Sequence, residues 1–325
     1  MDLSAGGDYE LDCVSDFTVS ITLTKKGLAN YEKVTDAVFK YMQRLKEVGP
    51  QEWVHAEKGK VGTLSFDFAE KGDPMNFCVS NARTMPHFKT PEDMTQLIRH
   101  KYTADDYNPE RLTDIVERLA DPAKCLIIVA SKSFEEATLP IHEKWYKFNY
   151  SCDKITPERV ASLRAAQVAE NGKSLDLPPA NNLIATNFDI LPEDASLSAR
   201  PQLVQQWDGI ADLWYKKDDK FKKPKALVGC KLYTGDLQFG SSPETAVFAE
   251  VWKRVLQESL REFTYMADCA KLHFSVNLPR DNIDLQWGGF NDSLINFVSE
   301  TLQRISAFKH MECREIFDQV KEKLT

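Results

Sequence analysis

Apolar and polar positions alternate over residues 17–23, where phenylalanine, valine, isoleucine and leucine are separated by threonine and serine. This two-residue period predicts a half-buried β-strand. Over residues 28–45 the apolar positions recur at helical spacing instead. Gly49-Pro50 then ends that helix and supplies a first-turn proline to a second helix, which begins at Trp53.

Residues 64–110 fit two patterns. Leu64, Phe66 and Phe68 alternate like a strand, yet the apolar positions from Trp53 onward also fit one face of a helix. We predict helix here, followed by a short helix over residues 110–119. The apolar run from Cys125 to Val129 then predicts a buried strand.

Alternation over residues 146–150 predicts another strand, and Thr156 is placed to cap a helix that continues to about residue 170. The pattern then collapses over residues 171–200, which contain three prolines and are followed by Pro201. This stretch is the predicted linker.

The sequence beyond the linker begins a new series of elements. Strands are predicted at residues 213–215, 226–233, 274–278 and 283–287, with helices at 243–270 and 292–308 and a last helix running into Thr325. Strands in local groups with helices on one face indicate an α+β fold. Nothing follows to cover the apolar side of the last helix, so this domain is expected to be incomplete.

Composition narrows the class of protein. The chain has 325 residues, 42% of them hydrophobic, and a net charge of −8, which suits two domains with real cores. No block of Lys and Arg is long enough to follow a phosphate backbone, so nucleic acid is not an expected partner. We expect no membrane association and a cytoplasmic location, because a signal peptide and a long apolar stretch are both lacking. Seven cysteines without a C-x-x-C pair fit a reducing compartment.

The sequence offers little catalytic chemistry. A zinc peptidase needs two imidazoles one helical turn apart and a nearby carboxylate, but neither H-E-x-x-H nor H-x-x-E-H occurs. His142-Glu143 comes nearest, with Tyr146 where the second histidine would stand. No nucleophile elbow, Walker loop or dinucleotide fingerprint occurs either. We therefore expect no catalytic residue, metal or cofactor in this chain.

Two glycine pairs stand out. Gly6-Gly7 precedes the first predicted strand, where glycine allows another backbone to approach closely, although a simple turn near the terminus is the favoured interpretation. Gly288-Gly289 follows a predicted strand and is interpreted as a turn.

Three stretches together resemble the insulysin (insulin-degrading enzyme-like) branch of the pitrilysin-type inverzincin metallopeptidases, in order and in spacing. They are Leu23-Thr24-Lys25-Lys26-Gly27-Leu28 with Gly49-Pro50-Gln51-Glu52-Trp53; Ser131-Lys132-Ser133-Phe134-Glu135 with Glu143-Lys144-Trp145-Tyr146; and Thr186-Asn187-Phe188-Asp189-Ile190-Leu191-Pro192 with Leu213-Trp214-Tyr215-Lys216-Lys217-Asp218-Asp219-Lys220-Phe221 and Pro224-Lys225-Ala226. The resemblance covers nearly the whole chain.

The resemblance implies two homologous α+β domains of the LuxS/MPP-like type, both incomplete. Residues 1–170 would belong to the second family domain, 171–200 to the linker between halves, and 201–325 to part of the third, or middle, domain. The family's zinc motif lies in its first domain, which this sequence does not contain. The implied partners are peptide substrates and a zinc-bearing N-terminal half or a homologous subunit.

One functional element is carried over by the resemblance. Insulysins have a glycine-containing strand edge in the second domain, an exosite that pairs with substrate backbone, and Gly6, Gly7 and Asp8 occupy the matching positions. Strand addition of this kind gives affinity through main-chain amides. Asp8 stands where the family has an uncharged polar residue, and Met75 stands where insulysins have an anion-binding arginine.

Two functions remain open at this point. The chain is either a non-catalytic middle portion of an insulysin-like zinc metalloendopeptidase, forming chamber wall and exosite for short peptides, or a pseudoenzyme or scaffold subunit without proteolytic activity. In both cases it is expected to be inactive alone.

Overall fold

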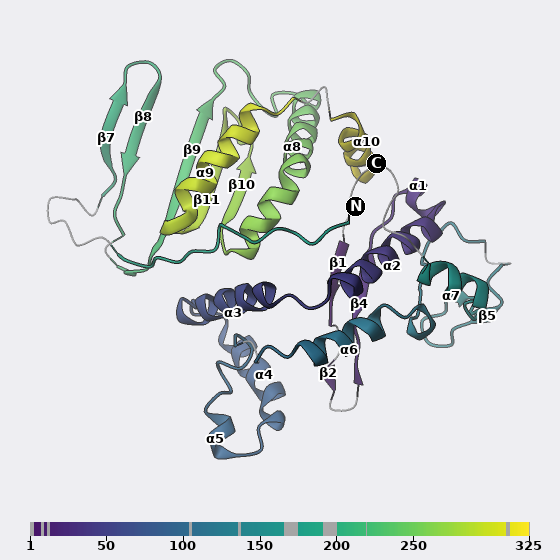
Figure 1. Cartoon of the computed structure of the whole chain (residues 1–325). Coiled ribbons are helices and arrows are strands. Elements are labelled where there is room, and N and C mark those ends of the chain that lie inside the picture. The colour runs from purple at the N-terminus through teal and green to yellow at the C-terminus, as the bar shows by residue number, and fades with distance from the viewer. Residues whose placement is uncertain are drawn as a thin grey trace. The chain divides into compact units, whose positions relative to one another are not determined.

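A computed structural model describes residues 3–7, 10–11, 14–103, 106–135, 138–165, 175–190, 200–218, 220–309 and 313–324 (Figure 1). The chain forms two compact units that interleave along the sequence. The first contains Met1–His55 and Asp105–Pro179, and the second contains Ala56–Ala104 and Ala180–Thr325. Helix α3 (Glu52–Asp67) begins in the first unit and ends in the second.

The first unit combines short strand pairs with helices. Its elements are β1 (Leu3–Gly6), β2 (Glu10–Leu11), β3 (Val14–Ser15), β4 (Thr18–Ile21), α1 (Lys25–Leu28), α2 (Tyr31–Val48), α6 (Pro109–Leu119), the 3-10 turn η2 (Pro122–Lys124), β5 (Ile141–His142), β6 (Asn149–Tyr150) and α7 (Pro157–Arg164). β1 pairs with β4, β2 with β3 and β5 with β6, each antiparallel. These elements confirm the predicted strand near residue 19 and the helix that follows.

Polar contacts join the helices of this unit. The Gln43 amide of α2 donates to the Ala120 carbonyl after α6 at 3.0 Å. Arg159 of α7 pairs with Asp36 of α2 at 2.8 Å. Gly49 ends α2 with φ 71°, a left-handed conformation that favours glycine, and its N–H donates to the Leu45 carbonyl. The predicted helix stop is confirmed.

The prediction of a buried strand from Cys125 to Val129 was wrong. Within the described residues this segment pairs with no strand, and Leu126 and Ile128 are 80% and 78% exposed. A strand needs a neighbour for its backbone groups and its apolar faces. The local sequence pattern shows only which side chains are apolar. It does not show whether another strand lies beside this segment.

The second unit holds the larger sheet. Its elements are α4 (Pro74–Thr84), η1 (Met85–His87), α5 (Pro91–Met94), β7 (Gln202–Trp207), β8 (Ala211–Tyr215), β9 (Lys225–Tyr233), α8 (Pro243–Cys269), β10 (His273–Asn277), β11 (Asn282–Phe290), α9 (Asn291–Ser306) and α10 (Arg314–Leu324). β10, β11 and β9 form an antiparallel sheet in that order, and β7 and β8 form a separate hairpin. The α+β class is confirmed.

One core joins this sheet to its helices. Leu256 and Leu260 of α8, Phe297 of α9, and Leu285 and Trp287 of β11 are all buried in the same cluster. α8 and α9 therefore cover one face of the sheet, as their apolar stripes require. The last helix, α10, packs on α8 through Val320, which is 4% exposed, whereas Phe317 and Leu324 stay exposed. Its apolar side is thus partly covered within the chain.

Gly288 and Gly289 were wrongly interpreted as a turn, because both lie inside β11. A Cβ on Gly288 would come within 2.3 Å of the His273 ring, and one on Gly289 within 2.4 Å of Leu272 Cδ2. Gly289 also has φ 145°, which an L side chain rarely adopts. The pair therefore allows Leu272 and the start of β10 to lie close against the neighbouring strand β11.

Gly62 has a similar role in α3, which continues to Asp67 without weakening. A Cβ at this position would lie 2.0 Å from the Tyr102 carbonyl oxygen. Phe66 packs against Tyr102, and Arg99 lies over the Phe66 ring. Glycine lets the turn after α5 approach the helix closely. The helical prediction for this region is confirmed for α3 and α4.

Residues 181–188 pack against the rest of the second unit. The Asn181 amide donates to the Met266 carbonyl of α8 at 2.7 Å, and Leu183 is 5% exposed in the core. The Asp292 carboxylate accepts the N–H groups of Thr186 at 2.7 Å and Asn187 at 3.0 Å. These contacts fix the described part of the predicted linker. The division into domains at residues 170 and 200 stays a prediction.

Candidate peptide-binding strand edge

The structure places Gly6 as the last residue of β1, opposite Thr18 of β4. A Cβ on Gly6 would meet nothing within 4 Å, and one on Gly7 would make ordinary contact with the Asp16 carbonyl oxygen at 3.4 Å. Gly7 is exposed and follows the strand directly. Asp8 lies outside the described residues. The structure thus brings Gly6 and Gly7 to the end of one strand.

The described residues provide β1 with one strand neighbour, β4. The other side of β1 is an edge, where alternate backbone N–H and C=O groups can pair with an added strand. Leu3 is 64% exposed, and Ser4 and Ala5 are also exposed. An extended peptide is the ligand that such an edge can hold.

His142 and Glu143 have structural partners. The Glu143 carboxylate accepts the backbone N–H of Trp145 at 2.8 Å and also that of Tyr146. These two N–H groups lower the pKa of Glu143, because they favour the charged carboxylate. His142 Nδ1 lies 2.8 Å from Asn149 Oδ1 across the β5–β6 pair. The dyad shapes the turn between β5 and β6.

The described part of the chain contains no group of three or more His, Cys, Asp or Glu side chains placed to hold a metal ion. The whole sequence also lacks both zinc-binding motifs, H-E-x-x-H and H-x-x-E-H. Met75 lies 70% exposed in the first turn of α4.

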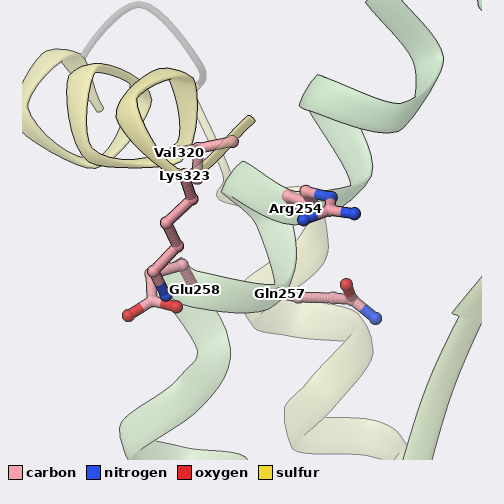
Figure 2. A pocket seen from close by; sticks show the side chains of 5 residues that line it. All are labelled: Arg254, Gln257, Glu258, Val320 and Lys323. Atoms are coloured by element: carbon pink, nitrogen blue, oxygen red, sulfur yellow. The ribbon is translucent and has the colours of Figure 1, made fainter. Parts of the chain in front are cut away.

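A shallow hollow lies between α8 and α10 (Figure 2). Arg254, Gln257 and Glu258 line it from α8, and Val320 and Lys323 line it from α10. Figure 2 shows the Lys323 side chain extending toward Glu258. The lining contains no histidine and no cysteine, and its Glu258 carboxylate pairs with Arg261 of the same helix at 3.0 Å.

A comparison with protein families matches residues 66–325 to the middle or third domain of peptidase M16. This match covers more than half of the chain. The chain belongs to the peptidase M16 family.

Curated relatives place this M16 chain in the insulysin-like branch. It is 28% identical to human insulin-degrading enzyme over 94% of its length, and 30% identical to Arabidopsis thaliana insulin-degrading enzyme-like 1, peroxisomal, over 99%. It spans 29% and 32% of those two proteins, respectively. The chain thus corresponds to about a third of the relatives' length.

A solved structure supports the M16 fold. The crystal structure of pitrilysin matches 99% of this chain with a TM-score of 0.72 at 20% identity, and the chain covers 33% of that structure. The recognition of an insulysin-like M16 segment is therefore confirmed, as is the α+β class. Two homologous domains of the LuxS/MPP-like type stay a prediction.

Sequence reasoning missed β7 of the M16 chain, since it began the second series of strands at residue 213. The signal that could have found it is the pair of apolar stretches on either side of Asp208-Gly209, a typical hairpin turn sequence.

The described helices include none whose length and apolar content would let it span a bilayer.

Proposed function

We propose that this chain is a non-catalytic portion of an insulysin-like zinc metallopeptidase and that it binds peptide substrates through the free edge of β1. The observation that carries the proposal is the M16 family match in a sequence that lacks the zinc motif. The edge of β1, ending at Gly6 and Gly7, supplies the backbone groups for peptide binding. Zinc and the reacting groups would come from a separate part of the peptidase.

We also propose that this chain forms part of the wall of the chamber that encloses the substrate.

Binding at the edge of β1 favours low sequence specificity, because an added strand is held by backbone hydrogen bonds rather than by its side chains. The relatives named insulin-degrading enzyme and nardilysin support peptides as the substrate class. We propose a cytoplasmic location, although one relative is named peroxisomal.

The first test is proteolysis by reconstitution. Zinc content and cleavage of a quenched fluorogenic peptide are measured for the purified chain, for a zinc-bearing M16 half from the same source, and for their mixture. We expect cleavage to increase in the mixture, with no zinc in this chain. If the mixture cleaves the peptide no faster than the zinc-bearing half alone, this chain is a scaffold or pseudoenzyme subunit instead.

The second test asks whether the edge of β1 holds the peptide. Neighbouring residues in a strand direct their N–H groups to opposite edges. Of Ala5→Pro and Gly6→Pro, one variant therefore loses an N–H group that faces β4 and the other loses one that faces the free edge of β1. We expect the variant that loses the N–H group at the free edge to bind peptide about tenfold more weakly while its circular dichroism stays unchanged. Equal binding by both variants and the parent chain would remove the exosite from the proposal.

A further inference from the structure

Negative charge is concentrated in the segment that contains β1 and β4. The first 24 residues contain no Lys or Arg and five acidic residues, Asp2, Asp8, Glu10, Asp12 and Asp16. The remaining 301 residues contain 41 basic and 44 acidic residues. Residues 1–24 therefore carry −5 of the chain's net charge of −8, although they make up less than a tenth of its length. A segment with charges of one sign attracts ligands of the opposite sign.

The two paired strands contribute no charged side chain themselves. β1 has the sequence Leu-Ser-Ala-Gly and β4 the sequence Thr-Val-Ser-Ile. The connection between the two strands leaves the pair at the end where Gly6 lies opposite Thr18. Lys25 and Lys26, the first basic residues along the chain, follow β4 at its other end. The strand pair thus lies between an acidic connection and a basic one.

Asp16 brings a described carboxylate to the Gly6 end of the pair. It is exposed, and the described residues provide it with no salt bridge. A Cβ on Gly7 would lie 3.4 Å from the Asp16 carbonyl oxygen, so the backbone of Asp16 lies beside the residue that follows β1. Its charge is therefore available to a ligand that pairs along β1.

We propose, on the basis of the proposed peptide-binding role, that the free edge of β1 selects peptides rich in Lys and Arg. Backbone pairing with β1 holds any extended peptide. The acidic segment adds attraction for a cationic peptide and repulsion for an anionic one. Each exposed charge pair contributes little in water, so the preference comes from several charges together and depends on salt.

The test compares three peptides of about eight residues, long enough to cover β1, with both ends blocked. All have a centre of alternating valine and threonine, with a pair of lysine, glutamine or glutamate residues at each end. Isothermal titration calorimetry with the purified chain is expected to show about fivefold tighter binding of the lysine peptide than of the glutamine peptide in about 0.1 M salt. The glutamate peptide should bind most weakly. In about 1 M salt, where the Debye length falls to about 3 Å, the three affinities should converge.

A charge reversal beside the edge is the matching protein variant. In about 0.1 M salt, Asp16→Lys should weaken binding of the lysine peptide about threefold and leave the glutamine peptide unaffected. Asp153→Lys is the control, because it changes the net charge equally at an exposed position between β6 and α7 of the same unit. It should bind both peptides as the parent chain does. Both variants must keep the circular dichroism of the parent.

Two outcomes would overturn the charge preference. One is equal affinity for the three peptides in about 0.1 M salt, and the other is the same loss in Asp16→Lys and Asp153→Lys, which would indicate an effect of overall charge.

The proline variants of β1 separate this inference from the proposed function. If the three peptides bind equally and the variant at the free edge weakens them all, β1 binds peptides without charge selection. If that variant weakens none of them, neither the peptide-binding edge nor its charge preference survives.

Discussion

Single glycines decide how closely two segments approach in the second unit. Gly289 has φ 145°, and a Cβ there would lie 2.4 Å from Leu272 Cδ2 and 2.9 Å from the Lys271 carbonyl oxygen. Lys271 itself has φ 64°, so the backbone on both sides of this contact adopts conformations unfavourable for most residues. The close approach of Lys271 and Leu272 to β11 therefore depends on the missing side chain.

Gly289→Ala is expected to lower the free energy of unfolding by roughly 1–3 kcal/mol, the usual cost of overpacking a tight site. Gly229→Ala in β9 is the control, since a Cβ there would meet nothing within 4 Å, and its effect should be near zero. Urea unfolding followed by tryptophan fluorescence measures both. A Gly289→Ala variant as stable as the control would mean that Lys271 and Leu272, which precede β10, move away at little cost in free energy.

The Asp292 carboxylate has a defined electrostatic role. The N–H groups of Thr186 and Asn187, with the Thr186 hydroxyl, lower its pKa below the ordinary aspartate value. The folded state therefore binds the proton more weakly than the unfolded state. Its stabilisation is complete above the unfolded pKa of about 4 and is lost as pH falls through the lower folded pKa.

Asp292→Ala should consequently loosen residues 183–188 at neutral pH, and the difference from the parent chain should shrink as pH falls below about 4. Hydrogen exchange of residues 183–188, measured from neutral to acid pH, gives the answer. Asp236→Ala, at an exposed aspartate between β9 and α8, is the control and should exchange like the parent. A difference that grows in acid would contradict this assignment.

At the scale of elements, the sequence predicted a helix or strand correctly where the residues that determine it all lie in one short segment. Thr156 caps α7 through the Arg159 N–H, and Ser242 with Thr245 forms a capping box for α8. The sequence also places β9 and β11 within a few residues of their ends. These elements have apolar stripes or strong termini that a single window of sequence contains.

Two wrong interpretations concern segments whose conformation depends on distant partners. Cys125 to Val129 has the composition of a buried strand, yet no described strand pairs with it. The Gly288-Gly289 interpretation failed for a related reason, since the need for glycine arises from His273 and Leu272 on the neighbouring strand and the turn before it. The candidate site was predictable only in part. Gly6 ends β1, a strand that the sequence pattern did not predict, and the free edge beside it depends on pairing across the sheet.

At the scale of the whole molecule, the two units do not correspond to two continuous stretches of sequence. Residues 56–104 belong to the unit that also contains residues 180–325. Leu64 of α3, Ala185 and Phe290 are buried together in one cluster. A boundary drawn at residue 200 would therefore separate side chains that share a core.

We expect a fragment of residues 180–325 to unfold at a higher temperature than one of residues 201–325, because Leu183 and Ala185 fill space in the core. Differential scanning calorimetry compares the two. Leu183→Ser in the longer fragment should remove a large part of the gain, whereas Asn182→Ser should not. Equal melting temperatures would show that residues 180–200 contribute nothing to this core.

The interleaving of the units also sets an order of events during synthesis on the ribosome. Phe68 packs edge-on against Phe290 and lies beside Phe188. Translation at about 5–20 residues per second makes Phe68 roughly 10–40 s before Phe290 exists. For that time the apolar side chains at the end of α3 lack the partner that β11 provides, so we expect the half-made chain to be more prone to aggregation than the finished one.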